Sequence, residues 1–450
     1  MKFTFNCVST FLLLALIKVP FLVTSTDNPP SPDQISDKST LVNPANPHGG
    51  HVHPDVITFT DTPSPSPMLD TYTVSPDVIN FTDTPSPGLT SDNYIPVGPP
   101  ESAFIVSLRT HDPGNDTVAF TPPTYINTIV TNPDQGPDNY TYFLENWIKP
   151  DDWLAALEKE ANSGPILIFI HGFNNLAPAA VTRYIAVRDG MSHAGGNVTV
   201  VCFDWASGDS GLYNTDHATA VASGHYLVDL IALINKFSTN INILTHSMGG
   251  YVVQNALANP PNSSRMWPIN NVMMAEADVL KLSFDYESGP SGVTNLRRAT
   301  PTSVLSCFMK LVQNLTVYWS NYDLVLKAAP AYDFINKTHW TSCGQAEPLS
   351  TYHLARLGLT GMTLSSEYIN KTYNVGYSQY YEQVYSNKPT IKDSHVWPIL
   401  GSTNNPKPAS DSAFMTDVWE VVNHSQNFTS REKIAPHDYI FTVPPTEFLH

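Results

Sequence analysis

Short apolar runs alternate with segments of helical periodicity from about residue 102 onward. The run at 166–170, Ile-Leu-Ile-Phe-Ile, is continuously apolar and lies between Pro165 and His171-Gly172. This pattern is typical of a strand that is buried on both faces of a parallel sheet. Further runs of the same kind occur at 198–203, 241–244, 271–274 and 315–319.

Helical periodicity appears between these runs, most clearly at 218–237 and 250–258. Strands and helices that alternate along a chain form a mostly parallel sheet with helices on both faces. The sequence therefore predicts one α/β domain, which we place at residues 101–450.

The region ahead of that domain, residues 26–100, is dense in Pro, Ser, Thr and Asp and contains an internal repeat. The segment 54–65 recurs 22 residues later as 76–87. Two copies are too few for a repeat solenoid, and acidic Pro-rich sequence cannot bury enough apolar surface to fold alone. We therefore expect an extended, disordered arm.

The N-terminus combines a basic start at Lys2 with an apolar run at 8–23 and a small-residue exit. This order predicts a secretory signal peptide covering residues 1–25, and hence a secreted protein. A membrane anchor is the alternative, but Lys18 and Pro20 interrupt the run. No later run is long and apolar enough for a bilayer, so we expect no transmembrane segment in the mature chain.

Composition narrows the possible partners. A formal net charge of −17 opposes binding to nucleic acid or to anionic membranes, because phosphate recognition needs clustered Lys and Arg. With 42% hydrophobic and 11% aromatic residues the chain has ample material for a core, so disorder throughout is excluded. The sequence thus predicts a folded domain without a nucleic-acid partner.

An exported chain can carry disulfides and glycans. Cys202 lies in a strand-like run and is expected to be a buried thiol, whereas Cys307 and Cys343 could pair in an oxidising compartment. No Cys or His spacing suits zinc, so no metal is predicted. Asn-X-Ser/Thr sequons, which are candidate glycosylation sites, occur at Asn80, Asn115, Asn139, Asn197, Asn262, Asn314, Asn336, Asn370, Asn423 and Asn427.

Ser247 lies between a predicted strand and a predicted helix. This is the setting of a nucleophile elbow, in which a tight turn lifts a serine hydroxyl above the carboxyl end of a sheet. Small residues two positions before and after the serine avoid backbone clashes; Gly249 meets that need, whereas Thr245 stands where Gly is commonest. A plain turn serine is the alternative, but the strand, the helix and His246 favour a nucleophile.

A nucleophilic serine also needs donors for the oxyanion that its attack creates. The Met248 backbone N–H, at the start of the helix, is one candidate. The other is the Phe173 N–H, because His171-Gly172-Phe173 closes the predicted strand at 166–170. These two N–H groups form the predicted oxyanion hole.

The acid and the base are expected downstream of the serine, in the chain order serine, acid, histidine. Asp323 follows the strand at 315–319 in a polar loop, and its rival Asp278 leaves the preceding strand. We favour Asp323, although both placements suit this arrangement. For the base we favour His395, on a final loop ahead of a helix at 416–422, over the alternatives His339, His353 and His424.

These roles predict a reaction. His395 accepts the Ser247 proton as the hydroxyl attacks a carbonyl, Asp323 stabilises the imidazolium, and water later cleaves the acyl-enzyme. The expected substrate is a small-molecule or lipid ester, and no cofactor is expected. A catalytically idle binding protein and a structural protein that uses the Pro-rich arm are the alternatives.

Three sequence blocks resemble the alpha/beta hydrolase family of unknown function DUF900, whose motifs occur in the same order. The blocks are His171–Asn175, Phe203–Gly208 with Tyr213 and Asp216, and His246–Gly249. Ala206 replaces the family's usual Pro. The resemblance covers about residues 160–422 and implies the α/β-hydrolase fold and an esterase or lipase-like enzyme. The first two blocks are also similar to animal pancreatic-type lipases, in which the acid leaves the earlier strand, and this keeps Asp278 in consideration.

Overall fold

The computed structural model describes a set of segments that all lie within residues 73–450. The predicted signal peptide at 1–25 and the predicted arm at 26–100 lie outside the described residues. The described segments are 101–109, 123–131, 140–142, 146–208, 213–258, 269–284, 304–327, 329, 356–362, 368–384, 393–400, 411–424 and 428–441.

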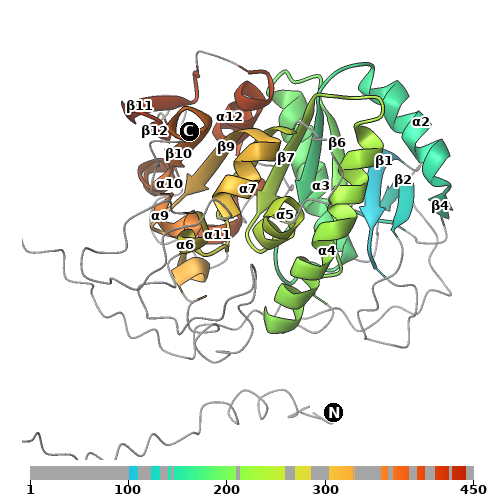
Figure 1. Ribbon diagram of the computed structural model, residues 1–450, viewed down its shortest axis with the longest axis horizontal. Helices are drawn as coiled ribbons and strands as arrows, with labels where there is room; N and C mark the ends of the chain where they lie inside the picture. Colours follow the sequence, from blue (N-terminus) through green and yellow to red (C-terminus); the bar gives the residue numbers. More distant parts are fainter. Residues whose placement is uncertain are drawn as a thin grey trace, which may run out of the picture. The chain divides into compact units, whose positions relative to one another are not determined.

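A twelve-stranded sheet forms the centre of the described part of the chain (Figure 1). Its strands are β1 (Glu101–Ser107), β2 (Thr124–Thr131), β3 (Tyr140–Thr141), β4 (Trp147–Ile148), β5 (Ile166–Ile170), β6 (Thr199–Asp204), β7 (Ile241–His246), β8 (Ile269–Ala275), β9 (Val312–Trp319), β10 (Thr372–Gly376), β11 (Arg431–Ala435) and β12 (Asp438–Phe441).

The strand order is β11-β12-β10-β9-β8-β7-β5-β6-β1-β2-β3, and β4 pairs with β2 beside this path. Pairing is parallel from β1 through the centre to β12. It is antiparallel only at the two margins, where β2 pairs with β1, β3 and β4, and β11 pairs with β12. The prediction of a mostly parallel sheet is confirmed.

Contacts on both faces explain why the central strands are apolar throughout. Along β5, Ile166, Ile168 and Ile170 belong to one hydrophobic core, and Leu167 and Phe169 belong to the other. Successive side chains of a strand point to opposite faces, so a strand between two helical layers must be apolar at every position. The five predicted strands all occur, with ends that differ by at most three residues.

Helices cover both faces of the sheet. One core is completed by α2 (Pro150–Ala161), α4 (Tyr213–Ile234), α5 (Gly249–Ala258), α6 (Lys281–Phe284) and α7 (Val304–Leu311). The other is completed by α3 (Ala177–His193), α10 (Ser378–Val384), α11 (Asp393–Leu400) and α12 (Ser412–Val422). Two further short elements are α9 (Leu357–Thr360) and the 3-10 helix η6 (Ile369–Lys371). Figure 1 shows α4 and α5 in front of the strands.

Among the described residues, α4 is the one helix long and apolar enough to be a candidate membrane span by length and composition. Half of its most apolar window is buried inside the protein, and α4 packs along α5. An apolar stripe that faces the core is typical of a covering helix in an α/β domain.

The connections around β5 position the site. From β5 the chain passes through α3 to β6 on one side, and then through α4 across to β7 on the other side. Open α/β sheets bind ligands at such a crossover, outside the carboxyl ends of the strands. The loops after β5 and β7, which carry the predicted oxyanion loop and Ser247, therefore meet at one edge of the sheet.

Candidate active site

Ser247 lies at the sharp turn between β7 and α5. Its φ is 54°, in the left-handed region that most side chains avoid. Its N–H donates to the Ala275 carbonyl at 3.1 Å, and its own carbonyl accepts from the Asp278 N–H at 3.1 Å. The end of β8 therefore holds this strained turn in place.

Two glycines allow the backbone segments around Ser247 to approach closely. A Cβ at Gly249 would lie 2.5 Å from the His171 carbonyl oxygen and 2.7 Å from Thr245 Oγ1. A Cβ at Gly172 would lie 2.8 Å from the Ser247 Cβ. Thr245 is thus tolerated two positions before the serine because Gly249, two positions after it, leaves room for the threonine hydroxyl.

The structure brings Ser247, His395 and Asp323 together in one hydrogen-bonded chain. His395 Nε2 lies 2.7 Å from Ser247 Oγ, and His395 Nδ1 lies 2.7 Å from Asp323 Oδ2. Because an ionised carboxylate can only accept, Nδ1 carries the proton and Nε2 accepts from the serine hydroxyl. Asp323 is fully buried, and its Oδ1 accepts from the Leu326 N–H at 2.9 Å.

His395 lies in the first turn of α11, so the prediction that it lies on a loop is wrong. This helix has only eight residues and includes Pro398, which leaves too little helical periodicity to detect in sequence. Buried Trp397 anchors the helix in the core. Ser394 Oγ also accepts from the Leu324 N–H at 3.2 Å, which ties the helix to the loop that carries Asp323.

None of the described alternatives for the acid and the base takes part in the hydrogen-bonded chain from Ser247. The carboxyl group of Asp278 accepts from Arg356 Nε and from the Tyr213 hydroxyl, both at 2.7 Å. Asp323, and not Asp278, is therefore the aspartate that hydrogen-bonds to His395. His424 is exposed beyond the end of α12 and lies 3.3 Å from Asn270 Nδ2, whereas His339 and His353 lie outside the described residues.

A second carboxyl group, which the sequence did not predict, lies beside the histidine. Glu276, at the end of β8, is fully buried and has a φ of 46°. Its Oε2 lies 3.3 Å from His246 Nε2 and 3.9 Å from His395 Nδ1. Burial, and then the charge of Asp323, raise the pKa of Glu276 well above its usual range. The only signal in sequence was its place after a strand, which it shares with Asp278.

His246 supports the helix that carries His395. Its Nε2–H donates to the His395 carbonyl at 2.8 Å, and the two imidazole rings lie 4.8 Å apart between centroids. Burial, and then the nearby His395, lower the pKa of His246 well below its usual value. His246 is therefore neutral and fixes the backbone of His395.

The predicted oxyanion donors remain available for a ligand. Neither the Phe173 N–H nor the Met248 N–H donates to any group among the residues that the structure describes. Gly172 in the same loop packs directly on Ser247, and Met248 follows Ser247 in the chain. The arrangement has the form of an oxyanion hole.

A buried charged cluster holds the loop that carries Phe173. The Asp204 carboxylate binds Arg109 through Nε and Nη2 at 2.8 to 3.0 Å, and it binds His171 Nε2 at 2.9 Å. Arg109 also donates to the carbonyls of Asn175 and Ser207, at 2.6 and 2.9 Å. Although burial opposes it, the Arg109 charge and the His171 hydrogen bond hold the pKa of Asp204 well below its usual value.

Further contacts fix the same loop from its other end. The Trp205 indole N–H donates to the His171 carbonyl at 2.7 Å, and the two rings stack. Asp216 accepts from the N–H groups of Asn174 and Gly208 and from Ser207 Oγ, at 2.9 to 3.1 Å. The first two of the blocks that carried the family resemblance therefore meet in one network that holds this loop. Arg109 lies outside those blocks, and no local signal marked it.

One cluster of described residues has the composition of a metal site. His246, Glu276 and His395 each offer one ligand atom, and these atoms lie within 4.8 Å of one another. His246 Nε2 and His395 Nδ1 both carry protons that hydrogen-bond to oxygen. A metal ion would have to displace both protons, so the residues fit a hydrogen-bond network better than a metal.

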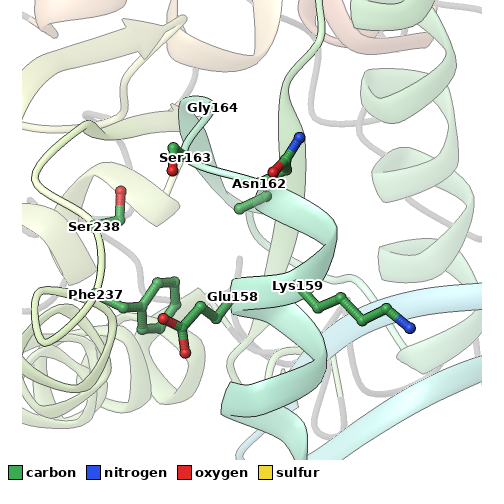
Figure 2. Close-up of a pocket in the computed structure, with 8 residues that line it drawn as sticks. Glu158, Lys159, Asn162, Ser163, Gly164, Phe237 and Ser238 are labelled. Carbon is green, nitrogen blue, oxygen red and sulfur yellow. The ribbon is translucent and has the colours of Figure 1, made fainter.

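A separate pocket of about 280 Å³ lies at the other end of β5 (Figure 2). Its walls come from the end of α2 and the segment after α4, and include Glu158, Asn162 and Phe237. It adjoins the start of β5 at Ile166, whereas the oxyanion loop follows the end of that strand. This pocket is therefore not part of the Ser247 site.

The remaining predicted sites are only partly described. Cys202 is buried in β6, whereas Cys343 and the side chain of Cys307 lie outside the described residues. Asn314 Nδ2, on β9, donates to Asn271 Oδ1 at 3.1 Å, which makes Asn314 a poor glycan acceptor. The exposed sequon asparagines are Asn197, Asn370 and Asn423. The other sequon asparagines lie outside the described residues: Asn80, Asn115, Asn139, Asn262, Asn336 and Asn427.

Residues 149–339 match the model of a family described as alpha/beta hydrolase of unknown function (DUF900). This segment of the chain is therefore similar to that family. The match confirms the resemblance seen in the sequence blocks. It begins ahead of the motifs, includes Ser247 and Asp323, and ends before His395.

Several solved structures are also similar to this chain. The Staphylococcus aureus fluorophosphonate-binding serine hydrolase FphF is 14% identical over 53% of this chain and 86% of its own, with a TM-score of 0.27. A Pyrobaculum calidifontis esterase is 11% identical over 58% and 77%, with a TM-score of 0.28. An extracellular α/β-hydrolase from a Paenibacillus species is 14% identical over 58% and 98%, with a TM-score of 0.22. The comparison with curated proteins gave no match.

Proposed function

We propose that this α/β-hydrolase is a serine hydrolase that cleaves carboxylic esters through an acyl-enzyme on Ser247. The observation that supports this most is the continuous chain from Ser247 Oγ through His395 to Asp323, with 2.7 Å at both contacts. Nucleophile, base and orienting acid in this geometry are what acyl transfer requires. The free N–H groups of Phe173 and Met248 supply the matching oxyanion donors.

The reaction follows from these positions. Ser247 Oγ attacks the ester carbonyl while its proton passes to His395 Nε2, and the carbonyl electrons move onto the oxygen that faces Phe173 and Met248. His395 returns the proton to the departing alkoxide, which leaves as an alcohol. Water then attacks the acyl-enzyme by the same route, releases an acid and restores Ser247.

Apolar side chains near the proposed site favour an apolar acyl or alkyl group. Phe173 and Tyr213 are partly buried, with ring centroids 5.7 Å apart, beside the oxyanion loop. Leu176 and Leu324, which follow the oxyanion loop and Asp323, are 38% and 37% exposed. Such surfaces bind hydrocarbon and offer no fixed charge to a substrate.

A fluorophosphonate probe and a panel of p-nitrophenyl esters test the proposal. The wild-type protein should be labelled, and Ser247→Ala should lose labelling and about 10⁶-fold in turnover. Ser192→Ala, at an exposed serine near the end of α3, is the matched control and should behave like wild type. Absence of labelling in a folded wild-type protein would instead support a catalytically idle binding protein.

We also propose that the chain is exported through its N-terminal segment. The basic start and apolar run at 8–23 support this, as do the exposed sequons at Asn197, Asn370 and Asn423. Expression of the full chain in a glycosylating secretory host should give medium protein that begins near residue 26, with glycans on those three asparagines. Intracellular protein that still begins at Met1 would contradict the proposal.

A further inference from the structure

His395 has two carboxyl groups within reach of the same ring nitrogen. Asp323 Oδ2 lies 2.7 Å from His395 Nδ1, and Glu276 Oε2 lies 3.9 Å from it. Both carboxyl groups are fully buried. The two acids come from the ends of neighbouring strands, β8 and β9, which pair in parallel. A carboxyl group from the end of the earlier strand, β8, therefore does face His395, but it belongs to Glu276 and not to Asp278.

The backbone holds Glu276 firmly in this position. Its N–H donates to the Tyr318 carbonyl at 3.1 Å. Gly358 packs so closely on the same residue that a Cβ there would lie 2.3 Å from the Glu276 carbonyl carbon. The left-handed φ of 46° is thus fixed from both sides, and such backbone outliers concentrate at functional sites.

The surroundings of Glu276 favour its neutral form while Asp323 is charged. The titratable groups that face it are Asp323, His246, His395 and Tyr377. Burial and the Asp323 charge both oppose its ionisation, and the neighbouring His246 is neutral. Two carboxyl groups that share one site do not both ionise readily.

We propose that Glu276 is a second positioning carboxyl for His395, which accepts the Nδ1 hydrogen bond when Asp323 cannot. The inference rests on the proposed function of His395 as the base. A closer approach of about 1.2 Å, from 3.9 to 2.7 Å, would bring Glu276 Oε2 to the distance that Asp323 now has. Loss of the Asp323 charge also removes one of the two causes that keep Glu276 neutral.

A double-mutant cycle tests this inference. Asp323→Asn, Glu276→Gln and the double variant keep the side-chain volumes, and kcat/KM is measured from pH 6 to pH 9 for each folded protein. Asp323→Asn should retain a residual activity that rises with pH as Glu276 ionises. Adding Glu276→Gln to Asp323→Asn should abolish that rise. The fold-loss in kcat/KM caused by Glu276→Gln should be at least ten times larger in the Asp323→Asn background than in the wild-type background.

An equal fold-loss in kcat/KM from Glu276→Gln in both backgrounds would overturn the inference, because the effect of a merely structural residue would not depend on Asp323. The cycle is repeated with Asp323→Ala, which remains informative if Asp323→Asn does not fold. A spectroscopic readout is the downfield proton resonance of His395 Nδ1, which should persist in Asp323→Ala and vanish in the double variant. Persistence in the double variant would contradict the role of Glu276.

The failure of this inference is separable from the failure of the proposed function. If Ser247→Ala retains full labelling and turnover, the serine-hydrolase proposal fails whatever the cycle shows. If wild-type activity depends on Ser247 and the cycle shows no coupling, only the role of Glu276 fails.

Discussion

The two sides of the Ser247 site balance charge in opposite ways. On the oxyanion side, the Asp204 carboxylate forms a salt bridge with Arg109 and a hydrogen bond with His171. On the acid–base side, the basic side chains within 4 Å of Asp323 and Glu276 are, among the described residues, the imidazoles of His395 and His246, with no Lys or Arg.

This difference suits what the proposed function requires of each side. A carboxylate that is neutralised by a guanidinium holds a loop rigidly and gains nothing more during a reaction. A carboxylate whose main partner is a neutral histidine gains most when that histidine takes a proton, which happens only in the transition state. Under the proposed function, the oxyanion side is thus a fixed support and the acid–base side responds to the reaction.

Asp323 and Asp278 give the sharpest test, because both are buried carboxyl groups at strand ends. Asp323→Asn should lower kcat by roughly 10³- to 10⁴-fold, since the amide leaves His395 poorly oriented and its charge unsupported. Asp278→Asn removes the partner of buried Arg356 and should cost about 3–5 kcal/mol of stability, with kcat of the folded fraction nearly intact. Ester turnover and urea unfolding are measured on both variants. A large loss of kcat in Asp278→Asn with kcat nearly intact in Asp323→Asn would make Asp278 the acid.

Asp204→Asn probes the oxyanion side. It leaves the Arg109 charge buried without its counter-charge and should cost about 3–5 kcal/mol of unfolding free energy. Turnover of the folded fraction should fall about tenfold or more, through the loosened Phe173 loop. Asp189→Asn, at a partly exposed ion pair with Arg188, is the control and should change stability by less than about 1 kcal/mol. Unchanged stability in Asp204→Asn would mean that the cluster is not the support described above.

The effect of Glu276→Gln on stability should change with pH in the direction opposite to that expected for removing a salt-bridged carboxylate. The pKa of Glu276 is raised on folding, so between about pH 4.5 and the folded pKa the folded state holds a proton that the unfolded state has lost. Stability of the wild type therefore falls through this window, by at most about 1.4 kcal/mol per pH unit from this group. The variant should gain stability over wild type as pH rises from 4.5 to 8, as followed by thermal unfolding. A gain that is the same at both pH values would contradict a neutral Glu276.

The sequence predicted those parts of the site that depend on contiguous residues. The Ser247 turn and the loop after β5 are local, because strand, turn and helix follow one another within a few residues. Arg109 could not be found this way, since it lies 95 residues before its partner Asp204. Glu276 and Asp278 leave the same strand, and only the left-handed backbone at Glu276 decides which of them faces His395. The fold class was predictable for the same reason as the strands: burial on both faces makes the strands apolar throughout.

The smallest expected effect concerns Thr245, at the point where the two sides of the site meet. Thr245 is fully buried, and its hydroxyl has no hydrogen-bond partner among the residues that the structure describes. Thr245→Val removes this unsatisfied hydroxyl at nearly constant volume and should raise stability by about 1 kcal/mol, measured by urea unfolding. Turnover should change by less than about twofold, because Ser247 is held by backbone contacts to β8 and not by the threonine hydroxyl. A large loss of turnover with a stable fold would show instead that the Thr245 hydroxyl helps to shape the elbow.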